Sequence, residues 1–218
     1  MKDTIPEEII TKINSSIKDK KYEQTIKIIE KIINDYKNNY YLYVNLGACY
    51  SSLNMYDKAL EAYNNALKIK EDDEFLFSNL GNLMLEKKNY EESIKLYKQG
   101  LLINQNSMSC QIGLASVYTR IQNYEEAHKI YLSLFKNEAI NYNVIIGLGI
   151  CLLYLKQFEK ALPFIQKAVE LNPNDRNATK SLSTIYHHLG KKNEAVKYTN
   201  KADGVIVFND DEEEYQII

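Results

Sequence analysis

The chain has 218 residues, 45% of them hydrophobic, and its 27 basic and 29 acidic side chains leave a formal net charge of −2. The charges are spread along the whole chain, so no basic stripe for a nucleic-acid backbone can be drawn. Eight Gly and three Pro are also too few for a turn-rich all-β protein. The composition predicts a largely helical protein that buries a sizeable core.

Features of targeting and redox chemistry predict a cytoplasmic protein. The longest mostly apolar stretch, residues 144–155, is too short to span a bilayer, and charges begin too early at the N-terminus for a secretory signal. The three cysteines, Cys49, Cys110 and Cys151, include no Cys-x-x-Cys pair, which argues against a disulfide framework or a zinc site. We expect buried thiols in a reducing compartment, no membrane partner, no metal and no cofactor.

The same residue types recur every 34 residues over almost the whole chain. A fixed period of this kind is typical of repeat architectures, in which each repeat is one supersecondary unit. Four columns keep one register without an insertion: aromatic at Tyr22, Tyr56, Tyr90, Tyr124 and Phe158; small at Gly47, Gly81, Ala115, Gly149 and Ser183; small again at Thr25, Ala59, Ser93, Ala127, Ala161 and Ala195; and large at Ile29, Tyr63, Tyr97, Tyr131 and Ile165. The period predicts six repeats, at residues 6–39, 40–73, 74–107, 108–141, 142–175 and 176–203.

Each repeat carries two helical patterns in succession. In the third repeat, one apolar stripe runs from Phe77 to Leu85 and a second from Tyr90 to Tyr97, both with the spacing of a helix face. The second patterns open with acidic residues such as Glu91, which suit the positive end of a helix dipole. We expect the glycine column to let a neighbouring helix backbone come close, and stacking of the pairs to bury a continuous core.

The second repeat matches a known motif. The tetratricopeptide pattern is aromatic-x2-Leu-Gly-x2-Tyr followed by Ala-x3-Phe. This chain has Tyr43-x2-Leu46-Gly47-x2-Tyr50 followed by Ala59-x3-Tyr63, and the fifth repeat adds Leu148-Gly149, Ala161 and Pro173 at the corresponding places. The chain therefore resembles the tetratricopeptide-repeat family over residues 6–203. Its first and last repeats diverge in the way that capping repeats do.

The resemblance implies an all-α fold, a right-handed α-solenoid of about six 34-residue helix-turn-helix repeats, followed by an acidic C-terminal tail at residues 204–218. In this family the first helices of the repeats line a concave groove that binds peptides or partner proteins. Carried over to this chain, the groove is lined mainly by apolar and amide side chains. The residues expected to bind a peptide are Tyr41, Val44, Asn45, Phe75, Asn79, Asn82, Ile112, Ile146 and Ile150.

Some family members grip the C-terminal carboxylate of a partner with a clamp of Lys, Asn and Arg. The corresponding places in this chain hold Ile10, Asn14, Asn45, Phe75 and Asn79. All three cations are missing, so an acidic C-terminus would lose its charge-assisted hydrogen bonds. We therefore expect peptide binding without a carboxylate clamp.

Asn45 and Asn79 occupy the same place in successive repeats. They resemble the asparagine ladder of the O-linked N-acetylglucosamine transferase repeats, whose amides hold a peptide backbone by donating to C=O and accepting from N–H. Gly113, Gly147 and Ser181 end the ladder in the later repeats. Compositional drift is the alternative explanation, because Asn is abundant throughout this chain.

The C-terminal segment departs from the repeat pattern. Asp203-Gly204 is a helix-ending signal, residues 205–208 predict a strand, and an acidic run follows at residues 210–214. Three alternatives stay open. The tail packs along the last helix as a cap, it lies in a groove of its own or a neighbouring chain and so supports self-association, or it begins a second domain outside this chain.

Catalytic patterns are missing from the sequence. The three histidines have no Ser, Cys or carboxylate series beside them, so we predict no catalytic residue and no enzyme activity. The predicted function is a protein–protein interaction scaffold that binds an extended segment of a partner protein. The alternative is an N-terminal regulatory or substrate-recruiting arm of an enzyme whose catalytic domain lies outside this chain.

Overall fold

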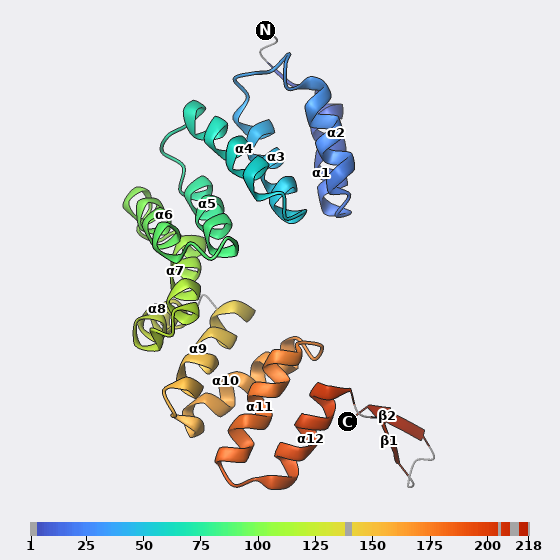
Figure 1. Ribbon diagram of the computed structural model, residues 1–218, viewed down its shortest axis with the longest axis vertical. Coiled ribbons are helices and arrows are strands. Elements are labelled where there is room, and N and C mark those ends of the chain that lie inside the picture. The colour runs from blue at the N-terminus through green and yellow to red at the C-terminus, as the bar shows by residue number, and fades with distance from the viewer. Residues whose placement is uncertain (1–3, 138–140, 205, 210–213, 218) are drawn as a thin grey trace. The chain divides into compact units, whose positions relative to one another are not determined.

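The computed structural model of the chain describes residues 4–137, 141–204, 206–209 and 214–217. Within these ranges the chain forms twelve helices and one two-stranded hairpin (Figure 1). The predicted all-α helical repeat fold is confirmed. The helices are α1 (Glu7–Lys18), α2 (Tyr22–Ile32), α3 (Tyr40–Ser52), α4 (Tyr56–Ile69), α5 (Glu74–Glu86), α6 (Tyr90–Ile103), α7 (Met108–Arg120), α8 (Tyr124–Lys136), α9 (Tyr142–Tyr154), α10 (Phe158–Leu171), α11 (Arg176–His188) and α12 (Lys192–Asp203).

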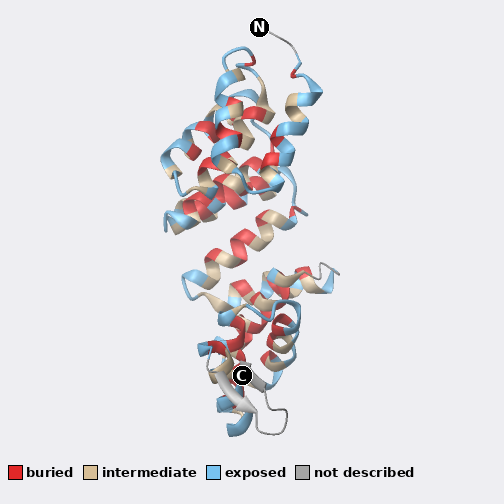
Figure 2. Cartoon of the chain, turned by 90° about the vertical axis from the view of Figure 1, so that its right-hand side faces the viewer, coloured by how far each residue is buried: buried red, intermediate tan, exposed pale blue. Residues whose placement is uncertain are grey.

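The helices pack in two compact units, residues 1–113 and 114–218, and α7 contributes to both. In the first unit α3 packs on α4 and α5 on α6, and in the second unit α9 packs on α10 and α11 on α12. Buried residues lie on the sides of the helices that face their neighbours, while exposed residues cover the outside (Figure 2). Each unit thus has its own apolar core between stacked helix pairs.

The 34-residue period reappears in the backbone at the turn between the two helices of each repeat. One residue of this turn has a φ between 57° and 74° in every repeat: Lys20, Asn54, Lys88, Gln122, Lys156 and Gly190. A left-handed residue ends a helix and redirects the chain. Because the second helix always begins two residues later, the aromatic column falls on its first residue.

Two first helices begin at an aspartate that is itself held in place. Asp73 caps α5 by accepting hydrogen bonds from two backbone N–H groups, and Asp175 does the same for α11. Lys70 Nζ donates to Asp73 over 2.8 Å, and the Tyr142 hydroxyl donates to Asp175. Burial alone would raise the pKa of Asp73, but hydrogen bonds from Lys70, Tyr40 and the backbone outweigh burial and hold that pKa below its ordinary value.

The glycine column makes room for side chains rather than for a neighbouring backbone, contrary to the expectation from sequence. A Cβ atom added to Gly47 would lie 2.5 Å from the Tyr63 ring, and one added to Gly81 would lie 2.6 Å from the Tyr97 ring. The helices stand far enough apart to admit these rings, which are almost fully buried. The large column of the second helices therefore fills the space that the glycines leave.

After α12 the chain forms an antiparallel hairpin of β1 (Ile206–Asn209) and β2 (Glu214–Ile217). Ile206 pairs with Ile217 and Asn209 with Glu214. The predicted strand at residues 205–208 overlaps β1, although Val205 lies outside the described residues. The acidic run also lies outside them, except for Glu214 in β2.

Candidate functional site

Six of the predicted peptide-binding residues lie on two first helices of the first unit. Tyr41, Val44 and Asn45 share one side of α3, and Phe75, Asn79 and Asn82 share one side of α5; we call this set the α3–α5 face. The two helices contact each other. Phe75 is 64% exposed and Asn82 is exposed, while the other four side chains are half-buried.

Hydrogen bonds fix the orientation of the amide groups on this face. Asn45 Nδ2 donates to the backbone oxygen of Tyr41 over 2.8 Å, and the Tyr41 hydroxyl donates to Asn14 Oδ1 over 2.8 Å. The Tyr97 hydroxyl donates to Asn82 Oδ1 over 2.6 Å. Asn45 therefore keeps its carbonyl oxygen for a ligand N–H group, and Asn82 keeps its two N–H groups for a ligand carbonyl.

The remaining three predicted residues do not join this face as a group. Ile112 is half-buried on α7. Ile146 and Ile150 belong to the second unit, where they stand one turn apart on α9 and are half-buried against its core. Their side chains contribute to packing as well as to the surface.

The end of the asparagine ladder has a packing cause. A Cβ atom at Gly113 would lie 2.2 Å from the Tyr97 ring, and one at Gly147 would lie 2.5 Å from the Tyr131 ring. An asparagine at either place would collide with a buried ring that comes from the second helix of the preceding repeat. The sequence carried this signal, because each of these tyrosines precedes its glycine by 16 residues.

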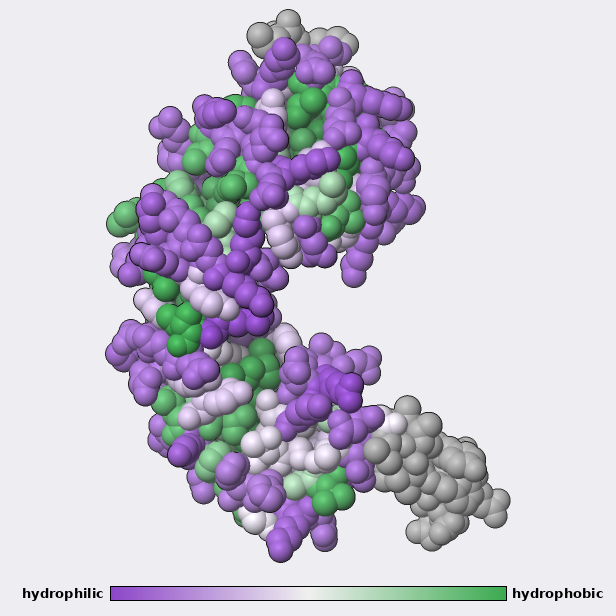
Figure 3. Space-filling view, in the orientation of Figure 1, coloured by the Kyte–Doolittle hydropathy of each residue, from purple (hydrophilic) through white to green (hydrophobic). Residues whose placement is uncertain are grey.

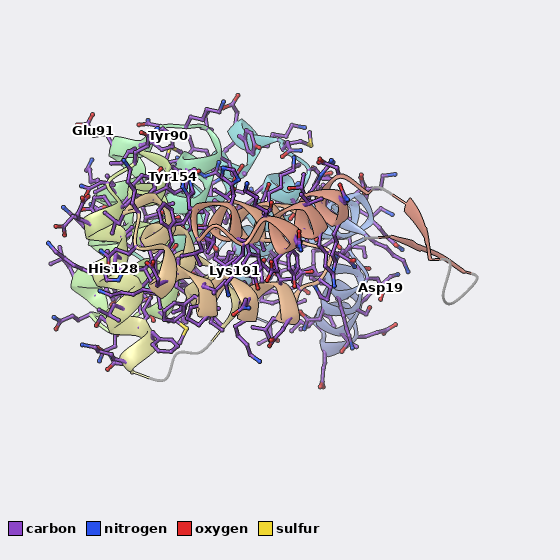
Figure 4. All side chains as sticks on the ribbon, turned by 90° about the horizontal axis from the view of Figure 1, so that it is seen from below. Asp19, Tyr90, Glu91, His128, Tyr154 and Lys191 are labelled. Atoms are coloured by element: carbon purple, nitrogen blue, oxygen red, sulfur yellow. The ribbon has the colours of Figure 1, made fainter. Side chains whose placement is uncertain are left out.

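Aromatic pairs on the second unit were not predicted from the sequence. Tyr154, which is labelled in Figure 4 and is 58% exposed, stacks on Tyr124 with ring centroids 4.5 Å apart. Phe158 stacks on His188 in the same way at 4.3 Å. In each pair the first residue of a second helix meets the last residue of the next first helix. Within the described residues, no group of His, Cys, Asp and Glu could hold a metal ion.

The surface of the first unit is mostly hydrophilic, with apolar residues showing between its helices (Figure 3). One hollow of about 290 Å³ lies between α2 and α4 over α3. It shares no residue with the α3–α5 face, and the sequence gave no warning of it. Its lining residues are Ile33, Tyr43, Leu46, Tyr50, Lys58, Glu61, Ala62 and Asn65.

Comparisons with known proteins agree on the fold. Two family models of the tetratricopeptide repeat match, one at residues 40–73 and 143–175 and the other at residues 76–107. No curated protein sequence matches the chain. No helix in the described ranges combines the length and the hydropathy that crossing a membrane requires.

Solved structures with low sequence identity share the architecture. A tetratricopeptide repeat protein from Parabacteroides merdae is 18% identical with a TM-score of 0.71, over 90% of this chain and 78% of its own. PilF of Pseudomonas aeruginosa is 13% identical with a TM-score of 0.76, over 87% and 86%. YrrB, described as a TPR protein with an unusual peptide-binding site, is 20% identical with a TM-score of 0.60, over 80% and 90%. The matched repeats and the shared fold place the chain in the tetratricopeptide-repeat family.

Proposed function

We propose that this protein is a non-enzymatic scaffold whose α3–α5 face binds an extended segment of a partner protein. The exposed Phe75 ring beside the Asn79 and Asn82 amides carries this proposal. A ring gives an extended chain an apolar contact, and the amides pair with its backbone without regard to its sequence.

The orientation of the amides supports backbone recognition. Asn45 offers an acceptor, and Asn82 offers donors, since Tyr97 occupies its carbonyl oxygen. An extended peptide carries N–H and C=O groups in alternation and can satisfy both. The peptide-binding site of YrrB, a protein of similar fold, makes this use of the fold reasonable.

We also propose that the face works without a carboxylate clamp. Among the clamp places, Ile10 is half-buried on α1 and Phe75 replaces a cation on α5. A C-terminal carboxylate would find no Lys or Arg at these places, so the proposed ligand is an internal segment.

The experiment selects binding peptides from a displayed library of random twelve-residue peptides on the immobilised full chain. The selected peptides are then titrated against the wild type, the double variant Phe75→Ala/Asn79→Ala, and the control Lys95→Ala/Lys98→Ala on the exposed side of α6. We expect the first variant to weaken binding by about tenfold or more with unchanged helicity, and the control to bind like the wild type. Equal affinity of all three proteins for every selected peptide would remove the α3–α5 face from the function.

The rival role as an arm of a larger enzyme makes a different demand. It requires a catalytic domain encoded downstream of residue 218 in the same reading frame. The reading frame of the source gene distinguishes the two roles directly.

A further inference from the structure

The hollow between α2 and α4 has an aliphatic floor and a polar rim. Ile33, Leu46 and Ala62 form the floor, and the exposed residues Lys58 and Glu61 stand at the rim with Asn65. Its volume of about 290 Å³ is at the lower limit of ligand pockets, enough for one large side chain but not for a helix.

Comparison of the repeats shows why the hollow exists. Ala62 is the seventh residue of its second helix, and every other repeat has a large side chain there. These equivalent residues are Ile28, Leu96, Ile130, Phe164 and Tyr198. The alanine therefore leaves empty a space that the other repeats have a side chain to occupy.

The fifth repeat shows what such a side chain does. Phe164 packs edge-on against Phe135 of the preceding second helix, with ring centroids 5.4 Å apart and an interplanar angle of 81°. Phe135 and Ile33 hold equivalent places, each the eleventh residue after the start of its second helix. An aromatic ring over Ile33 would thus reproduce in the first unit a contact that the protein already makes in the second unit.

The walls of the hollow are held in place before any ligand arrives. The Tyr50 hydroxyl on α3 donates to Glu30 Oε1 on α2 over 2.6 Å, and Lys58 Nζ lies 5.4 Å from the centroid of the Tyr50 ring. The hydrogen bond ties α3 to α2 along one side of the hollow. A preformed site of this kind costs little ordering free energy on binding.

We propose that this hollow binds the side chain of a phenylalanine residue presented by a partner protein. The ring lies on Ile33, Leu46 and Ala62, in the place that Phe164 takes against Phe135. The rim is complementary to the peptide groups beside such a residue, because Glu61 accepts from N–H while Lys58 and Asn65 donate to C=O. The site is separate from the α3–α5 face and does not rest on it.

The test places a thiol at the rim and asks which side chain the hollow retains. The variant Asn65→Cys is equilibrated in a dilute thiol buffer with N-acetyl-Cys-Gly-Phe-amide, N-acetyl-Cys-Gly-Ala-amide and 2-phenylethanethiol at equal concentrations. Intact mass spectrometry then measures the three mixed disulfides. The native cysteines are buried, and the wild type measures any exchange at them. We expect the Phe peptide to exceed the Ala peptide by about tenfold.

Two further variants separate the hollow from general stickiness. Gln99→Cys is the matched control, since Gln99 holds the place of Asn65 in the third repeat, where Leu96 stands at the place of Ala62. Ala62→Phe in the Asn65→Cys background fills the hollow, with Ala62→Leu as the substitute should the phenylalanine variant lose its cooperative melting. Both are expected to give near-equal Phe and Ala adducts.

Three results would overturn the proposal. They are equal adducts at Asn65→Cys, an equal preference at Gln99→Cys, or a preference that survives filling of the hollow. Preferential capture of 2-phenylethanethiol over the Phe peptide would also overturn it, because the occupant would then be a small aromatic molecule. The variants of the α3–α5 face leave this exchange unchanged, so the two proposals fail independently.

Discussion

Gly147 on α9 gives the sharpest test of how the repeats fit together. Its Cβ in a Gly147→Ala variant would lie 2.5–2.7 Å from three atoms of the Tyr131 ring. That ring is only 4% exposed, and its hydroxyl is bound to Ser116 Oγ at 3.1 Å, so it cannot swing away freely. Alanine gains about 1 kcal/mol in helix propensity, whereas overpacking of a core costs about 1–3 kcal/mol and sometimes more.

We expect Gly147→Ala to lower the free energy of unfolding by about 1–2 kcal/mol, measured by urea unfolding with far-UV circular dichroism. The control is the same substitution in a Tyr131→Leu background, where the collision is gone. There the propensity gain remains, and Gly147→Ala becomes neutral or stabilising. A change of the same sign and size in both backgrounds would show that the ring does not require this glycine, and our account of the interrupted ladder would fall with it.

Three other predictions follow from individual contacts. Gly190→Ala, at φ 74° with no heavy atom within 4 Å of the new Cβ, costs about 1 kcal/mol from backbone strain alone, whereas Lys156→Gly at φ 59° raises the thermal midpoint; a reversed order would contradict the role given to the turn. The pKa of Asp73 lies below its ordinary 3.8, so its carboxylate stabilises the fold above that pH and this contribution is lost as the pH falls through the folded pKa; Asp73→Asn should cost about 1 kcal/mol at pH 7 and nothing in strong acid, which urea titrations at both pH values measure. Burial raises the pKa of Cys49 and Cys151 to about 11, so the native thiols should react slowly with a disulfide reagent at pH 8 and all three should react in urea.

The fold was predictable because its determinants are local and periodic. The first residues of the second helices, such as Tyr56 and Tyr90, start at the predicted period because the same turn precedes each of them. The aromatic places around Tyr63 and Tyr97 were predicted as core and are buried. Periodicity reveals such positions since they repeat the same environment.

The features that sequence reasoning missed depend on what stands across an interface. Ala62 looks like an ordinary small residue until its equivalents in the other repeats are compared and the opposing Ile33 is known. The partner of β1 could not be predicted either, because residues 214–217 were read only as part of a tail. The peptide-binding role of the α3–α5 face remains a proposal, since exposure and hydrogen bonding fix its chemistry but not its ligand.

The coupling between tyrosine and glycine also shapes the chemistry of the first-helix faces. In the first unit Tyr97 excludes a side chain at Gly113 and uses its hydroxyl to orient Asn82. In the second unit Tyr131 excludes one at Gly147, and its hydroxyl pairs with Ser116. The amide lost at each glycine is thus accompanied by a phenol hydroxyl from the preceding second helix. Polar groups on these faces are therefore chosen by core packing one repeat earlier, so substitutions at Tyr97 should alter peptide binding at Asn82 although the Tyr97 ring is buried.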